Sequence, residues 1–158
     1  MANNANDVVL TADGNAKLEE ELHYLETEKR DEVGERIRIA REFGDISENS
    51  EYDDAKNEQA MMEGRIAEIT RILGEATVVD APTKSSKVHI GSKVTVDMGG
   101  NERVFTIVGA AESDSTAGKI SNESPVGAAL LGTKKGDEID LQGPTGRDIH
   151  IKVLKIEQ

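Results

Sequence analysis

The apolar positions between residues 14 and 76 recur with a helical period. Downstream of Tyr52 they follow alternating steps of three and four residues, which is the spacing of a heptad seam. The members of this seam are Tyr52, Ala55, Gln59, Met62, Ile66, Ile69 and Leu73. A second seam lies upstream and consists of Leu18, Leu22, Leu25, Lys29, Val33, Ile37 and Ala40. The pattern therefore predicts two amphipathic helices, at 14–43 and 52–75.

The numbering of the two seams predicts that the helices fold back on each other. In an antiparallel pair the numbers of facing residues have a constant sum, and six facing pairs here have sums between 94 and 96. The turn then falls within GDISENS (44–50), where Gly44 suits a helix end and Ser47, Asn49 or Ser50 a helix start. Thirty helical residues would form a rod of about 45 Å. Thr11 or Asp13 is expected to cap the first helix.

The pattern changes to period two after residue 83. SKVTVDM (92–98), the turn Gly99-Gly100-Asn101 and RVFTIV (103–108) predict a β-hairpin. Alternation at 139–141 and 149–153 predicts further strands, and SPVGAALLG (124–132) predicts a short helix.

These elements define an α+β protein with an antiparallel helical hairpin followed by a small, mostly antiparallel sheet and one short helix. We expect the hairpin domain at 1–80 with its tip at 44–51, a linker at 81–87 and the sheet domain within 83–158.

The composition narrows the possible chemistry. The net charge of −12 excludes a general basic surface for nucleic acid, and the absence of Cys excludes disulfides and thiolate chemistry. Only four aromatic residues are present, so we expect no large aromatic-lined pocket. The chain shows no signal peptide and no apolar stretch of about 20 residues, which predicts a cytoplasmic protein without membrane contact.

The predicted turn carries an acidic cluster. Its members are Asp45, Glu48, Glu51, Asp53 and Asp54. Acids at a helix N-terminus complement the helix dipole, and this accounts for the last three. For Asp45 and Glu48 a second interpretation stays open, because carboxylates also hold Mg²⁺ and orient water. An EF-hand is excluded, because its glycine position is Ser50 and its final glutamate position is Lys56. Two or three carboxylates on an open turn would bind a metal weakly without ligands from elsewhere.

A basic strip lies behind the acidic cluster, formed by Arg36, Arg38, Arg41 and Lys56. These cations could pair with helix glutamates, which is the more common arrangement, or they could contact phosphates. The antiparallel register predicts that Arg41 and Lys56 are neighbours. The sequence pattern alone leaves both interpretations open.

Several segments resemble one family over nearly the whole chain, the bacterial Gre transcript-cleavage factors and especially their GreA branch. The resemblance is carried by IRIAREFGDISENSEYDDAKNEQ (37–59), GRIAEITRIL (64–73) and ISNESPVGAALLG (120–132). It implies a coiled-coil hairpin and an FKBP-like C-terminal domain. It further implies that the hairpin enters the secondary channel of a backtracked bacterial RNA polymerase and stimulates the polymerase to hydrolyse the 3′ end of its transcript. The protein itself would be a monomeric cofactor of the polymerase and not an enzyme.

The same resemblance assigns roles to residues. Asp45 and Glu48 would be the catalytic acids and would share an Mg²⁺ with the polymerase, with no stably bound cofactor. Arg41 and Lys56 would contact the nascent RNA 3′ end. The residues that would support the tip are Asn49, Ser50 and Tyr52. The residues that would dock on the polymerase are Ser124, Pro125, Gly127, Leu130 and Leu131.

Three alternatives remain. A channel-binding regulator without cleavage activity would share the fold, although such relatives change the tip. A prolyl isomerase would need an aromatic-walled pocket, for which 83–158 offers only Phe105. A structural coiled-coil adaptor would keep its function after loss of both tip acids.

Overall fold

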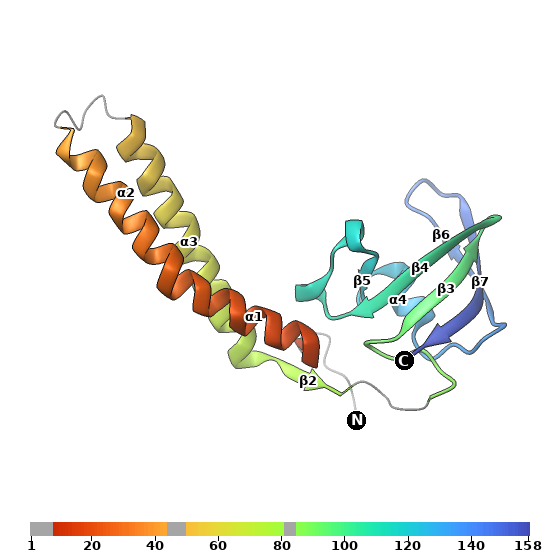
Figure 1. The fold of residues 1–158 in the computed structure, drawn as a ribbon. Helices are drawn as coiled ribbons and strands as arrows, with labels where there is room; N and C mark the ends of the chain where they lie inside the picture. The colour runs from red at the N-terminus through yellow and green to blue at the C-terminus, as the bar shows by residue number, and fades with distance from the viewer. Residues whose placement is uncertain (1–7, 44–49, 81–84) are drawn as a thin grey trace. The chain divides into compact units, whose positions relative to one another are not determined.

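The computed structural model describes residues 8–43, 50–80 and 85–158 (Figure 1). The chain forms two compact units. One consists of 16–75 and is helical, and the other combines the described residues before 16 with those after 75. No helix within the described ranges has both the length and the apolar character needed to cross a membrane.

The helical unit is the predicted antiparallel hairpin. Its first arm consists of α1 (Ala12–Tyr24), a π-helical turn (Leu25–Lys29) and α2 (Arg30–Glu42), and its second arm is α3 (Ser50–Glu75). The arms lie side by side in Figure 1. The hydroxyl oxygen of Thr11 accepts a hydrogen bond from the backbone N–H of Gly14 at 3.0 Å, so Thr11 caps the first arm.

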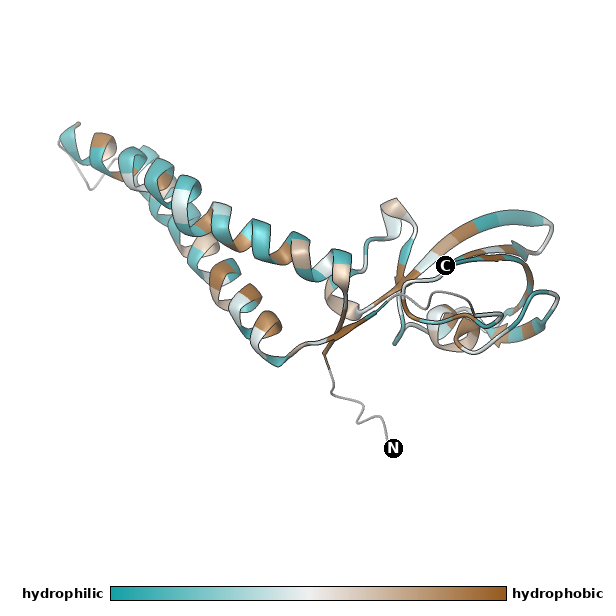
Figure 2. Ribbon diagram, turned by 60° about the horizontal axis from the view of Figure 1, so that its bottom comes forward, coloured by the Kyte–Doolittle hydropathy of each residue, from teal (hydrophilic) through white to brown (hydrophobic). Residues whose placement is uncertain are grey.

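The hydrophobic seam holds the arms together. Its buried members are Leu18, Leu25, Val33, Ile37, Ala40, Ala55, Met62, Ile66, Ile69 and Ile72. Figure 2 shows hydrophobic residues recurring between hydrophilic ones along the helices. Leu22 and Leu73, which were predicted to face each other, are both only half-buried, and Ile72 is buried in addition to the predicted seam positions. This pair lies at the base of the hairpin, beyond the π-helical turn as counted from the tip.

The π-helical turn accommodates one extra residue in the first arm. The six seam steps from Leu18 to Ala40 take 22 residues, one more than six regularly alternating steps of three and four would take. A single unmatched residue in an α-helix would rotate the segment beyond it by about 100° and carry its apolar face away from the seam. A π turn has wider i→i+5 bonding and takes up that residue. The sequence analysis did not predict this turn.

Ion pairs also link the two arms of the hairpin. Arg65 donates two hydrogen bonds to Glu21, at 2.8 and 2.9 Å, and Arg30 donates two to Glu63, at 3.0 and 3.1 Å. The bonds from Arg65 hold the pKa of the Glu21 carboxyl below its usual value. Such exposed pairs contribute little stability each, and the hydrophobic seam supplies most of it.

The two short strands that precede and follow the hairpin in the sequence belong to the second unit. β1 (Val9–Thr11) pairs in parallel with β2 (Thr77–Val79). Glu112 holds β1, because its carboxylate accepts bonds from the Thr11 backbone N–H (2.8 Å) and hydroxyl (2.6 Å). The packing boundary of the unit therefore differs from the predicted division at residue 80. The sequence analysis did not predict this strand pair.

The second unit is the predicted sheet domain. Its five strands have the order β5-β4-β3-β7-β6, antiparallel except for the parallel pair β4–β5. The strands are β3 (Lys93–Met98), β4 (Asn101–Val108), β5 (Lys119–Ser121), β6 (Glu138–Gln142) and β7 (Asp148–Glu157). The predicted β-hairpin is confirmed, with its turn at Gly99 and Gly100, both of positive φ. The short helix α4 (Pro125–Leu130) also lies where predicted, and β5 was missed.

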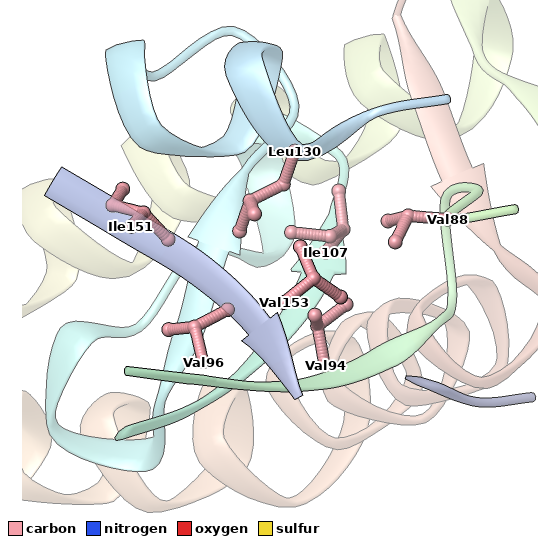
Figure 3. Packing of buried hydrophobic residues seen from close by; sticks show 7 residues of the cluster. All are labelled: Val88, Val94, Val96, Ile107, Leu130, Ile151 and Val153. Carbon is pink, nitrogen blue, oxygen red and sulfur yellow. The ribbon is translucent and has the colours of Figure 1, made fainter. Parts of the chain in front are cut away.

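An aliphatic core fills the space between this sheet and α4. Its fully buried members are Val88, Val94, Val96, Ile107, Leu130, Ile151 and Val153 (Figure 3). In Figure 3 the Leu130 side chain points from the helix side toward the valines and isoleucines of the strands. The core is as modest and aliphatic as the composition predicted.

Candidate functional site near the hairpin tip

The two helix ends that flank the predicted tip are described, and the acids between them are not. Asp45, Glu48 and Asn49 lie outside the described residues, so their roles stay predictions. On one flank α2 ends at Glu42, and on the other α3 begins with the exposed Ser50. The cations of the basic strip are all described, and their partners divide them into two groups.

The first group is neutralised by carboxylates. Arg38 donates hydrogen bonds to Glu35, at 3.0 and 2.6 Å, and to Glu42, at 2.6 Å, all within its own helix. Arg36 pairs across the hairpin with Glu58, which Lys29 also contacts at 2.5 Å. For Arg36 and Arg38 the common structural interpretation therefore applies.

The second group consists of Arg41 and Lys56, whose partners are neutral. The Arg41 guanidinium carbon lies 5.8 Å from the centroid of the Tyr52 ring, which is cation–π distance. The Lys56 ammonium donates a hydrogen bond of 2.9 Å to the side-chain oxygen of Gln59. Among the described residues, neither cation has a carboxylate within ion-pair distance. Both therefore keep their positive charge uncompensated by the described residues.

These four residues share one face of the hairpin. Tyr52, Lys56 and Gln59 follow each other at helical spacings of four and three residues, so they form one stripe along α3. Arg41 reaches this stripe from α2 through the Tyr52 ring. Arg41 and Lys56 each contact a residue of this stripe, and their direct proximity stays a prediction. The sequence analysis used Gln59 only as a seam position and missed its contact with Lys56.

A different stripe of α2 carries an exposed apolar hollow. Its volume is about 230 Å³, and its lining residues are Arg36, Ile39, Ala40, Phe43 and Glu51. Phe43 is 82% exposed and Ile39 is 41% exposed. The sequence analysis did not assign Phe43, although an aromatic residue directly before the acidic turn was a usable signal.

The predicted docking segment is partly an internal structure. The hydroxyl oxygen of Ser124 accepts a hydrogen bond from the Gly127 N–H at 3.1 Å and so caps α4, while Pro125 is exposed. Gly127 is buried, and a Cβ there would lie 2.0 Å from the Ser121 carbonyl oxygen. The Leu130 side chain is fully buried in the core. Gly127 and Leu130 therefore take part in the internal packing of the domain, and docking through Ser124, Pro125, Gly127, Leu130 and Leu131 stays a prediction.

An apolar pocket lies beside Ser124 and Pro125. Its volume is about 460 Å³, and it is lined by Phe105, Ile120, Ser124, Pro125, Val126, Leu141, Gln142, Gly143, Pro144 and Ile149. Phe105 is its single aromatic wall. The exposed start of α4 therefore borders an apolar pocket of the sheet domain.

Comparison with known families matches both parts of the chain. Residues 8–78 match the N-terminal domain of transcription elongation factors, and residues 82–158 match the GreA/GreB C-terminal domain. The chain thus belongs to the GreA/GreB family of transcription elongation factors.

Its relatives carry the GreA name. The chain is 54% identical to transcription elongation factor GreA of Clostridium acetobutylicum, over 94% of this chain and 96% of the relative. It is also 54% identical to GreA of Thermoanaerobacter pseudethanolicus, over 96% of this chain and 98% of the relative. Among solved structures, the GreA factor homolog 1 of Thermus thermophilus is 29% identical, covers 97% of this chain and 100% of its own, and has a TM-score of 0.41.

Proposed function

We propose that this protein stimulates transcript cleavage by a backtracked bacterial RNA polymerase. The hairpin enters the secondary channel, and Asp45 and Glu48 act at the polymerase active site, where the transcript 3′ end is hydrolysed. The protein works as a monomeric cofactor, and the polymerase carries the catalytic centre. The observation that supports the proposal is a pair of cations, Arg41 and Lys56, on the helices that flank these two acids, with no ion-pair partner among the described carboxylates.

The donor chemistry of Asp45 and Glu48 fits a shared magnesium ion. Mg²⁺ prefers oxygen ligands and is commonly held by one or two carboxylates while other ligands come from elsewhere. When bound, the ion would polarise a phosphoryl oxygen and lower the pKa of water. The two carboxylates would hold the ion and orient the attacking water. An incomplete ligand set explains why the proposed site functions only inside a polymerase.

The cations have a separate task in this proposal. The extruded RNA carries a negative charge on every phosphate, and contacts from Arg and Lys to phosphate position a strand without reading its sequence. Arg41 and Lys56 would hold the strand next to the acids. Repulsion between the acids and the RNA would otherwise oppose this approach in a protein of net charge −12.

Cleavage in purified backtracked elongation complexes tests the proposal. We expect the wild type to release short 3′ fragments, and we expect Asp45→Asn and Glu48→Gln to lower the rate at least about tenfold, since even outer-shell metal partners have effects of this size. Asp53→Asn is the matched control, because it removes an equal charge from the exposed first turn of α3 and should cleave at nearly the wild-type rate.

Competition binding to polymerase must accompany the cleavage assay. If the acid variants bind as tightly as the wild type and fail to cleave, the acids carry the chemistry. If the wild type binds and releases no fragment, the protein is a channel-binding regulator without cleavage activity. If both variants cleave as fast as the wild type, a structural role for the hairpin replaces the proposed one.

A further inference from the structure

The partners that Arg41 and Lys56 have among the described residues are neutral, which sets these two cations apart from Arg36 and Arg38. Arg36 and Arg38 contact carboxylates, which cancel their charge. Arg41 instead lies over the Tyr52 ring, and Lys56 instead contacts the Gln59 amide oxygen. Long, flexible side chains lose conformational entropy when they bind a ligand, because rotation about several of their bonds is restricted. A partner that restrains the side chain without cancelling its charge reduces this loss and keeps the attraction for an anion.

The aromatic contact suits arginine for this purpose. A guanidinium that lies over a ring face is attracted by the ring quadrupole. A cation–π contact is made by the charge of the guanidinium and needs none of its N–H donors, whereas a carboxylate would occupy them. These donors therefore remain available for the two oxygens of a phosphate.

The amide contact suits lysine in a similar way. The ammonium group has three donors, and Gln59 occupies one of them. The side chain is held in place by a neutral acceptor and keeps its full charge. A glutamate at position 59 would have almost the same shape and would turn this contact into an ion pair at i, i+3 spacing.

We propose that Tyr52 and Gln59 are positioning residues, which hold Arg41 and Lys56 without adding a negative charge, so that both cations are ready to receive the phosphates of the extruded RNA. This inference rests on the proposed function and extends it to two residues that do not themselves contact the RNA. It makes the neutrality of position 59 a requirement of the site, since a carboxylate there would hold Lys56 equally well and remove its attraction for RNA.

The substitution Gln59→Glu tests the inference on a partly exposed position where folding is not at risk. In backtracked complexes we expect it to raise the factor concentration for half-maximal cleavage about tenfold, the value of one charge-assisted hydrogen bond. The slope of log affinity against log salt should fall by about 0.7, as for one lost contact to single-stranded phosphate. Affinity for polymerase without RNA should not change. Asn57→Asp is the matched control, because it adds the same charge at an exposed neighbouring position and should stay within about twofold of the wild type.

Two substitutions of Tyr52 give an independent test. Tyr52→Leu removes the ring face and should raise the factor concentration for half-maximal cleavage in backtracked complexes. Tyr52→Phe keeps the ring face and should keep this concentration near that of the wild type. Melting temperatures of all variants show that the fold is retained.

Three results would overturn the inference. If Gln59→Glu matches Asn57→Asp while the wild type cleaves, the neutral partner is irrelevant and the proposed function still stands. If the variants weaken binding to RNA-free polymerase by the same factor, these residues act in docking or folding. If the wild type cleaves no RNA, the proposed function fails and this inference fails with it.

Discussion

At the scale of single residues, the charge of a side chain is less informative than the charge of its partner. The sequence identified Arg36, Arg38, Arg41 and Lys56 as one basic strip. The sequence could not show which of these cations pair with carboxylates, because that depends on which side chains meet across the hairpin. Arg36 finds Glu58 on the other arm, and Arg41 finds Tyr52. Leu130 shows the same limit, since an apolar residue in a docking motif can lie either in the core or on the surface.

His150 gives a prediction at this scale. Its Nδ1 lies 2.7 Å from the Asp140 carboxylate, and this hydrogen bond raises the pKa of the imidazole above its usual value. Because the folded pKa is raised, the pair stabilises the fold below pH about 6.5, the ordinary pKa of unfolded histidine, while Asp140 is ionised. The contribution is lost as the pH rises through the folded pKa.

A titration of His150 by NMR, in the wild type and in Asp140→Asn, checks this expectation. The midpoint should be lower in the variant, and the difference in unfolding free energy between the two proteins should shrink as the pH increases. Identical midpoints would show that the contact is too weakly populated in solution to act on the imidazole.

At the scale of elements, the hydrophobic seam was predictable and its irregularity was not. Burial favours one apolar stripe per helix, so regular steps of three and four residues identify each arm. The upstream seam contains three successive steps of four between Leu25 and Ile37. This run marks the extra residue that the π-helical turn accommodates at Leu25–Lys29. Gln59 was predicted only as a seam position, because periodicity identifies a face and not a hydrogen bond.

Deleting Thr27 tests this account of the π-helical turn. Thr27 is exposed, and its removal would leave 21 residues from Leu18 to Ala40, which is the length of six regularly alternating seam steps. We expect the turn to become α-helical and the unfolding free energy to change by about 1 kcal/mol or less.

Deleting Glu35 is the control, because it removes one residue from the regular part of α2. The deletion should rotate the segment on one side of it away from the seam. Each aliphatic seam side chain that becomes exposed should cost about 1.5–3 kcal/mol, so the protein should lose several kcal/mol of stability. Urea denaturation of both variants measures the difference. Equal losses would mean that the π-helical turn is not the site of the extra residue.

At the scale of the whole molecule, the two-part α+β organisation followed from the sequence, whereas the β1–β2 pair did not. Three-residue strands carry no detectable period, and the partners are separated by the entire hairpin. Their pairing depends on contacts far apart in the chain, such as the bonds from Thr11 to Glu112. Local sequence patterns therefore predicted both units but not the pairing of β1 with β2 in the second unit.

Two substitutions in α4 separate docking from folding. Pro125→Asp changes an exposed residue at the start of the helix, where an acid is favourable, so stability should change by less than about 0.5 kcal/mol. Affinity for polymerase should fall about tenfold if this end of α4 docks, as for a moderately important interface residue.

Leu130→Ala should instead destabilise the sheet domain by about 2–5 kcal/mol, because it leaves a cavity in the core. Thermal melts and polymerase competition on both variants distinguish the two effects. Unchanged polymerase affinity in Pro125→Asp would place the docking surface elsewhere.

The hydrophobic seam restricts the lengths that the hairpin can have. Each arm advances about 1.5 Å per residue, so the 26 residues of α3 measure about 39 Å. Any change in length must keep both seams in phase, which restricts matched insertions to whole heptads of about 10 Å. The distance that the tip can reach is therefore not continuously adjustable. Relatives or designed variants of this protein should differ in reach by discrete increments, with intermediate lengths accessible only through a compensating π-helical turn.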